Sequence, residues 1–68
     1  MIVASKNIKK YLEVAGITAR EFAERIGFDE QTVSQVLSGK ESPSSNFIES
    51  VLSKTGMDFE KAFMVKED

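Results

Sequence analysis

The stretch Thr18–Lys40, TAREFAERIGFDEQTVSQVLSGK, holds the pattern that decides the fold. Thr18 and Glu21 are spaced as a capping box, in which each side chain accepts a hydrogen bond from the other residue's backbone N–H at the start of a helix. An apolar stripe at helical spacing follows until Gly27, a residue type that ends helices by adopting a left-handed conformation. A second helix is predicted over residues 29–38. The stretch therefore predicts two short helices joined by a tight turn.

The second helix of this pair has two different faces. Its predicted buried stripe consists of Val33, Val36 and Leu37, and its opposite face carries Gln31, Ser34, Gln35 and Ser38. A helix selected only for solubility is usually richer in charged residues, whereas glutamine can both donate to and accept from an adenine edge. The pattern is typical of a helix that reads DNA bases. Taken alone, this face is explained equally well if Gln and Ser are merely tolerated on an exposed helix and have no binding role.

Three further helices are predicted around this pair. The first follows the N-cap Ser5 and runs from Lys6 to Ala15, a fourth follows Pro43, and a short last helix is capped by Asp58. Their inward-facing residues are predicted to be Ile8, Tyr11, Leu12 and Ala15 in the first, Phe47, Ile48, Val51 and Leu52 in the fourth, and Phe59, Ala62 and Phe63 in the last. Because four glycines each follow an apolar-periodic segment, the predicted fold class is all-α, a compact bundle of five helices.

Composition limits both the fold and the chemistry. A chain of 68 residues with 41% hydrophobic content supports a single domain over residues 1–68. It contains no cysteine and no histidine, so we expect no catalytic residues, no metal site, no cofactor and no enzymatic activity. No apolar run is long enough to span a membrane, and we expect a cytoplasmic protein. The net charge of −2 is unfavourable for nucleic-acid binding. Residues 1–40 are less unfavourable, because they carry six basic and five acidic groups, a net charge of +1.

The residues of the helix pair resemble those of the phage lambda-type repressor and Cro family, also called the xenobiotic-response-element (Xre) family. The most diagnostic positions are Ala23, Gly27, Val33-Ser34 and Gly39-Lys40. The likeness covers nearly the whole chain and implies a lambda-repressor-like DNA-binding domain with its helix-turn-helix at about residues 18–38. It also implies binding to double-stranded operator DNA as a dimer.

Carried over by position, the resemblance implies two groups of contact residues. Contacts to base edges are expected from Glu30, Gln31, Thr32, Ser34 and Gln35. Contacts to the DNA backbone are expected from Thr18, Arg20, Ser38, Lys40, Ser44, Ser45 and Asn46. The last three lie at a predicted helix N-terminus, whose unpaired N–H groups attract phosphate. A role for each of them as an N-cap alone is at least as good an interpretation.

Two departures from the family pattern affect the expected function. Ala19 stands where many phage repressors have a phosphate-binding glutamine, and residues 41–46 lack the expected cations. The leading hypothesis is a sequence-specific transcriptional regulator that acts as a repressor, binding a palindromic operator as a homodimer. One alternative is an antitoxin with a toxin protein as its partner, because residues 33–40 also look like the recognition helix of host-inhibition-of-growth antitoxins. Another is a protein-interaction module that has lost DNA binding.

Two minor patterns complete the predictions. Arg20 with Glu24, and Glu21 with Arg25, stand four positions apart and are expected to form ion pairs on the helix surface. The C-terminal region is unusually apolar, through Met57, Phe59, Phe63, Met64 and Val65. We expect most of these side chains to close the core and the remainder to form a dimer contact near the fourth and fifth helices.

Overall fold

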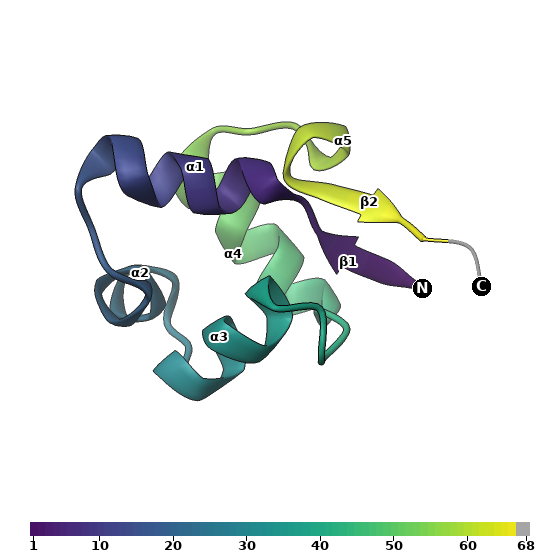
Figure 1. Cartoon of the computed structure of the whole chain (residues 1–68), viewed down its shortest axis with the longest axis horizontal. Coiled ribbons are helices and arrows are strands. Elements are labelled where there is room, and N and C mark those ends of the chain that lie inside the picture. The colour runs from purple at the N-terminus through teal and green to yellow at the C-terminus, as the bar shows by residue number, and fades with distance from the viewer. Residues whose placement is uncertain (67–68) are drawn as a thin grey trace.

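The computed structural model describes residues 1–66, which form five helices and one two-stranded antiparallel sheet (Figure 1). In chain order the elements are β1 (Ile2–Ala4), α1 (Lys6–Ala15), α2 (Ala19–Ile26), α3 (Glu30–Leu37), α4 (Ser45–Thr55), α5 (Phe59–Ala62) and β2 (Phe63–Val65). The prediction of a five-helix, all-α fold is confirmed. The hairpin of β1 and β2 is a small addition that the sequence did not predict.

Helices α2 and α3 form the predicted pair, joined by residues 27–29. The capping box at the start of α2 is present: Glu21 N–H donates to Thr18 Oγ1, and Thr18 N–H donates to Glu21 Oε1, both at 3.1 Å. Gly27 has a φ of 80°, and the next residue, Phe28, donates its N–H to the Ala23 carbonyl at 2.9 Å. These local bonds close the turn and fix where α3 begins.

One apolar core holds the elements together. Its buried residues are Ile8 and Leu12 of α1, Phe22, Ala23 and Ile26 of α2, Val33 and Val36 of α3, Phe47 and Val51 of α4, Ala62 of α5 and Phe63 of β2. Among residues 1–66 no polar or charged side chain is buried. Helices of eight residues, such as α2 and α3, are too short to be stable alone in water. Packing against this core therefore stabilises them.

The hairpin joins the two ends of the described chain. Ile2, Val3 and Ala4 pair with Val65, Met64 and Phe63 respectively. The hydroxyl of Ser42, in the loop after α3, donates to the Ile2 carbonyl at 3.2 Å. This bond ties that loop to the outer edge of β1, so the hairpin lies beside the end of α3.

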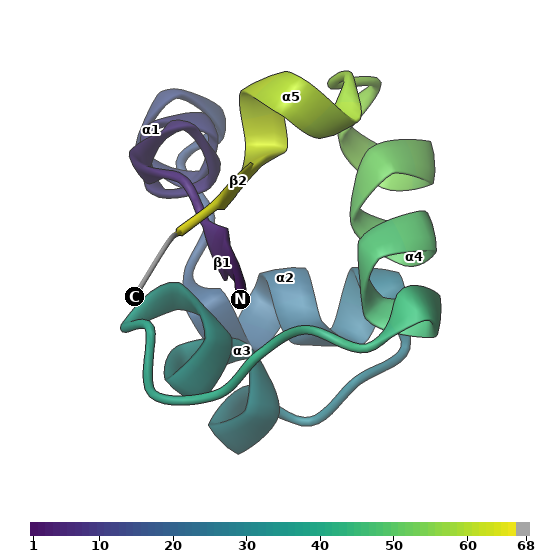
Figure 2. The ribbon, with the colours of Figure 1, turned by 90° about the vertical axis from the view of Figure 1, so that its right-hand side faces the viewer.

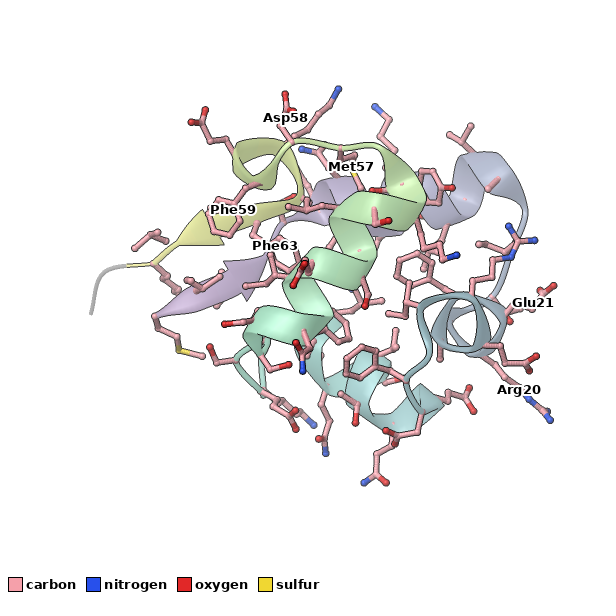
Figure 3. The ribbon with its side chains drawn as sticks, turned by 180° about the vertical axis from the view of Figure 1, so that it is seen from behind. Arg20, Glu21, Met57, Asp58, Phe59 and Phe63 are labelled. Atoms are coloured by element: carbon pink, nitrogen blue, oxygen red, sulfur yellow. The ribbon has the colours of Figure 1, made fainter. Side chains whose placement is uncertain are left out.

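Two predictions at helix ends are wrong, those for Ala15 and Phe63, and the one for Asp58 is confirmed in position only. Ala15 is exposed, because the last turn of α1 extends past the core. Asp58 occupies the N-cap position of α5 but makes no side-chain capping hydrogen bond. Phe63 is the first residue of β2 rather than part of α5, because its pairing with Ala4 holds it in an extended conformation. Its ring stacks on that of Phe59 with centroids 5.7 Å apart, and both side chains are labelled in Figure 3.

The elements are divided between two sides of the molecule. In Figures 1 and 2, α1 and α5 lie on one side, whereas α3 and the beginning of α4 lie on the opposite side, with α2 next to α3. No helix within residues 1–66 is long and apolar enough to cross a membrane.

Candidate nucleic-acid interface

Helix α3 turns one face to the core and the other to solvent. Val33 and Val36 are buried and attach the helix to the core. Of the residues predicted to contact bases, Glu30, Gln31 and Ser34 are exposed, whereas Thr32 and Gln35 are half-buried. The helix contains no lysine or arginine. Its solvent face therefore offers hydrogen-bonding groups and the Glu30 carboxylate, without a cation.

Asp29 and Thr32 cap the start of α3 with two hydrogen bonds. The Thr32 hydroxyl donates to Asp29 Oδ1 at 2.6 Å, and the Thr32 N–H donates to Asp29 Oδ2 at 3.3 Å. The bond from the Thr32 hydroxyl and, to a smaller extent, the bond from its backbone N–H hold the pKa of Asp29 below its ordinary value of 3.8. Because the Thr32 proton is directed to Asp29, its hydroxyl has only lone pairs left to offer a base.

The end of α3 is fixed by a Schellman motif. Gly39 N–H donates to the Val36 carbonyl at 3.2 Å, and Lys40 N–H donates to the Gln35 carbonyl at 2.9 Å. The Ser38 hydroxyl also donates to the Gln35 carbonyl, at 3.1 Å. Ser38 and Lys40 are both exposed at this end of the helix. Both termini of α3 are thus held by local hydrogen bonds.

The beginning of α2 presents Thr18 and Arg20. The Thr18 oxygen is an acceptor in the capping box, which leaves its proton free to donate to a phosphate. Arg20 lies 3.9 Å from Glu24, in a pair whose side chains are 76% and 73% exposed. Such an exposed pair contributes little to the stability of the fold. Figure 3 shows Arg20 projecting into solvent.

The second ion pair predicted on α2 does not form. Within residues 1–66 the pair of Arg20 and Glu24 is the only one. The Glu21 carboxylate accepts the backbone N–H of Thr18 instead of facing Arg25. The prediction for Glu21 and Arg25 is therefore wrong, and the reason is that the capping box already holds Glu21.

The beginning of α4 combines a cap with free donors. The Ser44 hydroxyl accepts the Phe47 N–H at 3.2 Å, so the interpretation of Ser44 as an N-cap is confirmed. Ser45 and Asn46 are exposed, and their backbone N–H groups have no acceptor within residues 1–66. Pro43 is buried and anchors the loop before them. This helix end therefore offers free N–H groups together with the positive end of the helix dipole.

The surface around α3 is poor in positive charge. Of the predicted contact residues, only Arg20 and Lys40 are cationic, while Asp29, Glu30 and Glu41 are acidic and exposed. Any phosphate binding here depends on hydroxyl and backbone donors as well as on cations.

The hairpin forms a feature next to α3 that sequence reasoning missed. A cavity of about 310 Å³ separates it from the end of α3, and its lining residues are Met1, Val3, Ala4, Leu37, Ser38, Gly39 and Lys66. Lys66 is thus a further cation near Ser38, which the sequence pattern did not indicate. The only signal in the sequence was a short apolar run at each end of the chain, at residues 2–4 and 63–65.

A pair of helices joined by a three-residue turn, with a solvent-facing polar stripe on the second, defines a helix-turn-helix domain of the DNA-binding type. The model of a protein family described as Helix-turn-helix (HTH_3) matches residues 8–61. The chain belongs to this family, the Xre and lambda-repressor-like family of DNA-binding regulators. No curated protein and no solved structure matches the chain significantly. The matched range contains α2, α3 and α4 in full and all but the outer ends of α1 and α5, and it leaves out both strands of the hairpin.

Proposed function

We propose that the chain recognises a specific double-stranded DNA sequence by placing α3 in the major groove. The observation that carries this proposal is the solvent face of α3, which presents hydrogen-bonding side chains and no cation. Hydrogen bonds hold both ends of this helix in place. We assign base contacts to Glu30, Gln31, Thr32, Ser34 and Gln35. Glutamine side chains match the donor and acceptor of an adenine edge, and the oxygens of Glu30 and Thr32 would accept from amino groups such as cytosine N4.

Contacts to the DNA backbone are assigned to the residues that flank α3. They are Thr18, Arg20, Ser38, Lys40, Ser44, Ser45 and Asn46. Arg20 and Lys40 supply charge, and the free N–H groups at the start of α4 supply directed donors. Such contacts fix the position and orientation of α3 on the duplex.

The regulator acts as a homodimer on a palindromic operator, because a single recognition helix spans too few base pairs to be selective. Of the four exposed large apolar side chains among residues 1–66, Met1, Met64 and Val65 lie in or next to the hairpin. The hairpin lies beside the end of α3. We therefore place the contact between protomers at the hairpin, which directly follows α5, rather than on α4 and α5 themselves as the sequence pattern indicated. Occupying an operator that overlaps a promoter would block polymerase, which makes the chain a repressor.

Selection from a random pool of duplex DNA tests the sequence preference. We expect enrichment of a palindrome whose half-sites lie about one helical turn apart, with two chains per duplex and a footprint over both half-sites. A footprint over one half-site at one chain per duplex would contradict the dimer. Absence of DNA binding even at low salt would contradict the whole proposal and favour a protein-interaction module.

A charge placed in the hairpin tests the proposed dimer contact. Met64→Glu should weaken dimerisation, measured by sedimentation equilibrium, because it introduces a carboxylate into an apolar contact. Val14→Glu makes a similar change at an exposed apolar residue of α1 and serves as the matched control. Equal dimerisation of both variants would place the interface elsewhere.

A further inference from the structure

The side of the molecule formed by α1 and α5 has a groove that DNA binding leaves unused. The groove has a volume of about 340 Å³, and it is lined by Asn7, Lys10, Tyr11, Val14, Met57 and Lys61. A second hollow of about 460 Å³ adjoins it, since both include Asn7 and Lys10 in their linings. The other residues of the second hollow are Lys6, Lys9 and Glu13.

Hydrogen bonds hold the two walls of the groove together. The carbonyl of Lys61, on α5, accepts from the Ser5 hydroxyl at 2.6 Å and from the Asn7 side-chain amide at 2.8 Å. The Thr55 hydroxyl accepts the Met57 N–H at 3.2 Å and so fixes the segment that carries Met57. The shape of the groove is therefore set by the hydrogen-bonded backbone of α1, α5 and the segment before α5, and not by freely moving side chains.

The groove combines an apolar lining with an excess of positive charge. Val14 is 82% exposed, the highest value among the large apolar residues described, and Tyr11 and Met57 beside it are half-buried. The two hollows together are lined by four lysines and one glutamate, although the whole chain has a net charge of −2. None of these lysines takes part in an ion pair within residues 1–66. The structure thus leaves cations around an exposed apolar side chain.

This side of the molecule faces away from the proposed DNA interface. Figures 1 and 2 show α1 and α5 on the side opposite to α3. A duplex held by α3 would therefore leave the groove open to another molecule.

We propose that the groove between α1 and α5 binds an acidic, amphipathic segment of a partner protein. Apolar side chains of that segment would pack against Tyr11, Val14 and Met57, and its carboxylates would meet Lys10, Lys61 and the lysines of the adjoining hollow. Complementary charge favours this occupant over a basic or neutral one, and the apolar lining favours a peptide with hydrophobic side chains over a purely polyanionic ligand.

A library of random peptides displayed on phage, selected on the intact protein, tests the proposal. We expect the recovered peptides to be enriched in Asp and Glu together with Leu and Phe. Tyr11 is the only tyrosine of a chain without tryptophan, so its fluorescence reports binding of a selected peptide that contains neither residue type. Recovery of peptides without acidic enrichment, or binding without a change in Tyr11 fluorescence, would overturn the proposal.

Charge reversal localises the site. The double variant Lys10→Glu with Lys61→Glu should bind the selected peptide at least about tenfold more weakly, because attraction at two positions becomes repulsion. Lys54→Glu, an exposed lysine on α4, should bind it as the unchanged protein does. Both variants should keep the thermal midpoint and the DNA affinity of the unchanged protein.

Three further outcomes, from these measurements and from sedimentation of the same variants with vesicles, would overturn the proposal. The first is equal peptide binding by the double variant and the unchanged protein. The second is a loss of DNA affinity in the double variant that is absent from Lys54→Glu, since the groove would then be part of the DNA interface. The third is lysine-dependent sedimentation with anionic phospholipid vesicles and no selected peptide, which would indicate a lipid surface instead.

Discussion

Gln31 and Gln35 carry most of the base recognition that we propose for α3. Gln31 is exposed, whereas Gln35 is half-buried and its carbonyl accepts hydrogen bonds from Ser38 and Lys40. The Gln35 carbonyl is a backbone group that any substitution keeps, but its half-buried side chain also packs, so Gln31, whose side chain is exposed, is the better single site at which to test recognition.

We expect Gln31→Ala to lose about 1–3 kcal/mol of discrimination at one base pair of each half-site, since a paired donor and acceptor are removed. The folded state should be unaffected, because the side chain is exposed. Affinities for the operator and for each single-base variant give the measurement. Ser53→Ala, an exposed change on α4, is the control. An unchanged preference at every position would remove Gln31 from the reading face.

Asp29 predicts a pH dependence of folding stability. Hydrogen bonds from Thr32 lower its pKa below 3.8 in the folded state. A group with a lowered pKa stabilises the fold when it is ionised, so its contribution is present above pH 3.8 and is lost as the pH falls through the lower, folded value. Asp29→Asn keeps an N-cap acceptor but removes the charge. Its thermal midpoint should be lower than that of the unchanged protein at neutral pH, and the two should converge in acid. A constant difference at all pH values would contradict this account.

At the scale of elements, Gly27 determines how α2 leads into α3. Its φ of 80° lies in the left-handed region, and a Cβ placed there would meet no atom within 4 Å. The cost of Gly27→Ala is therefore backbone strain alone, about 1–2 kcal/mol, with no clash added. Gly27→Asn should cost less, because asparagine tolerates this conformation better. Chemical denaturation of the three proteins gives the comparison, and equal stability of all three would mean that the turn is not constrained.

At the scale of the whole molecule, the distribution of charge predicts a weak dependence of DNA affinity on salt. Each phosphate neutralised by Lys or Arg contributes about −0.9 to the slope of log affinity against log salt, whereas hydroxyl and backbone donors add little. Arg20 and Lys40 are the assigned cations, with Lys66 nearby, and acidic residues oppose them. We expect a slope shallower than about −7 for a dimer. A value of about −10 or steeper would mean that other cations dominate the interface.

The candidate site was predictable from sequence to the extent that it depends on local structure. The solvent face of α3, the cap at Ser44 and the turn at Gly27 all follow from residues within a few positions of one another. Sequence reasoning could not show that the Thr32 proton is directed to Asp29, because the choice among its possible partners depends on side-chain geometry. It also missed Lys66, which reaches the end of α3 only through the pairing of β1 with β2.

The sequence by itself determined α1 to α4, their ends and, apart from Ala15, their buried faces, because caps and helical periodicity arise between residues at most four positions apart. Only the tertiary structure decided the hairpin. Strands of three residues carry too little pattern to be read, and Ile2 meets Val65 because the helices bring both ends of the chain to the same place. The tertiary structure also decided that the lysines of α1 lie beside α5 and opposite α3. No local pattern can predict such a placement, because it depends on how the helices pack around their shared core.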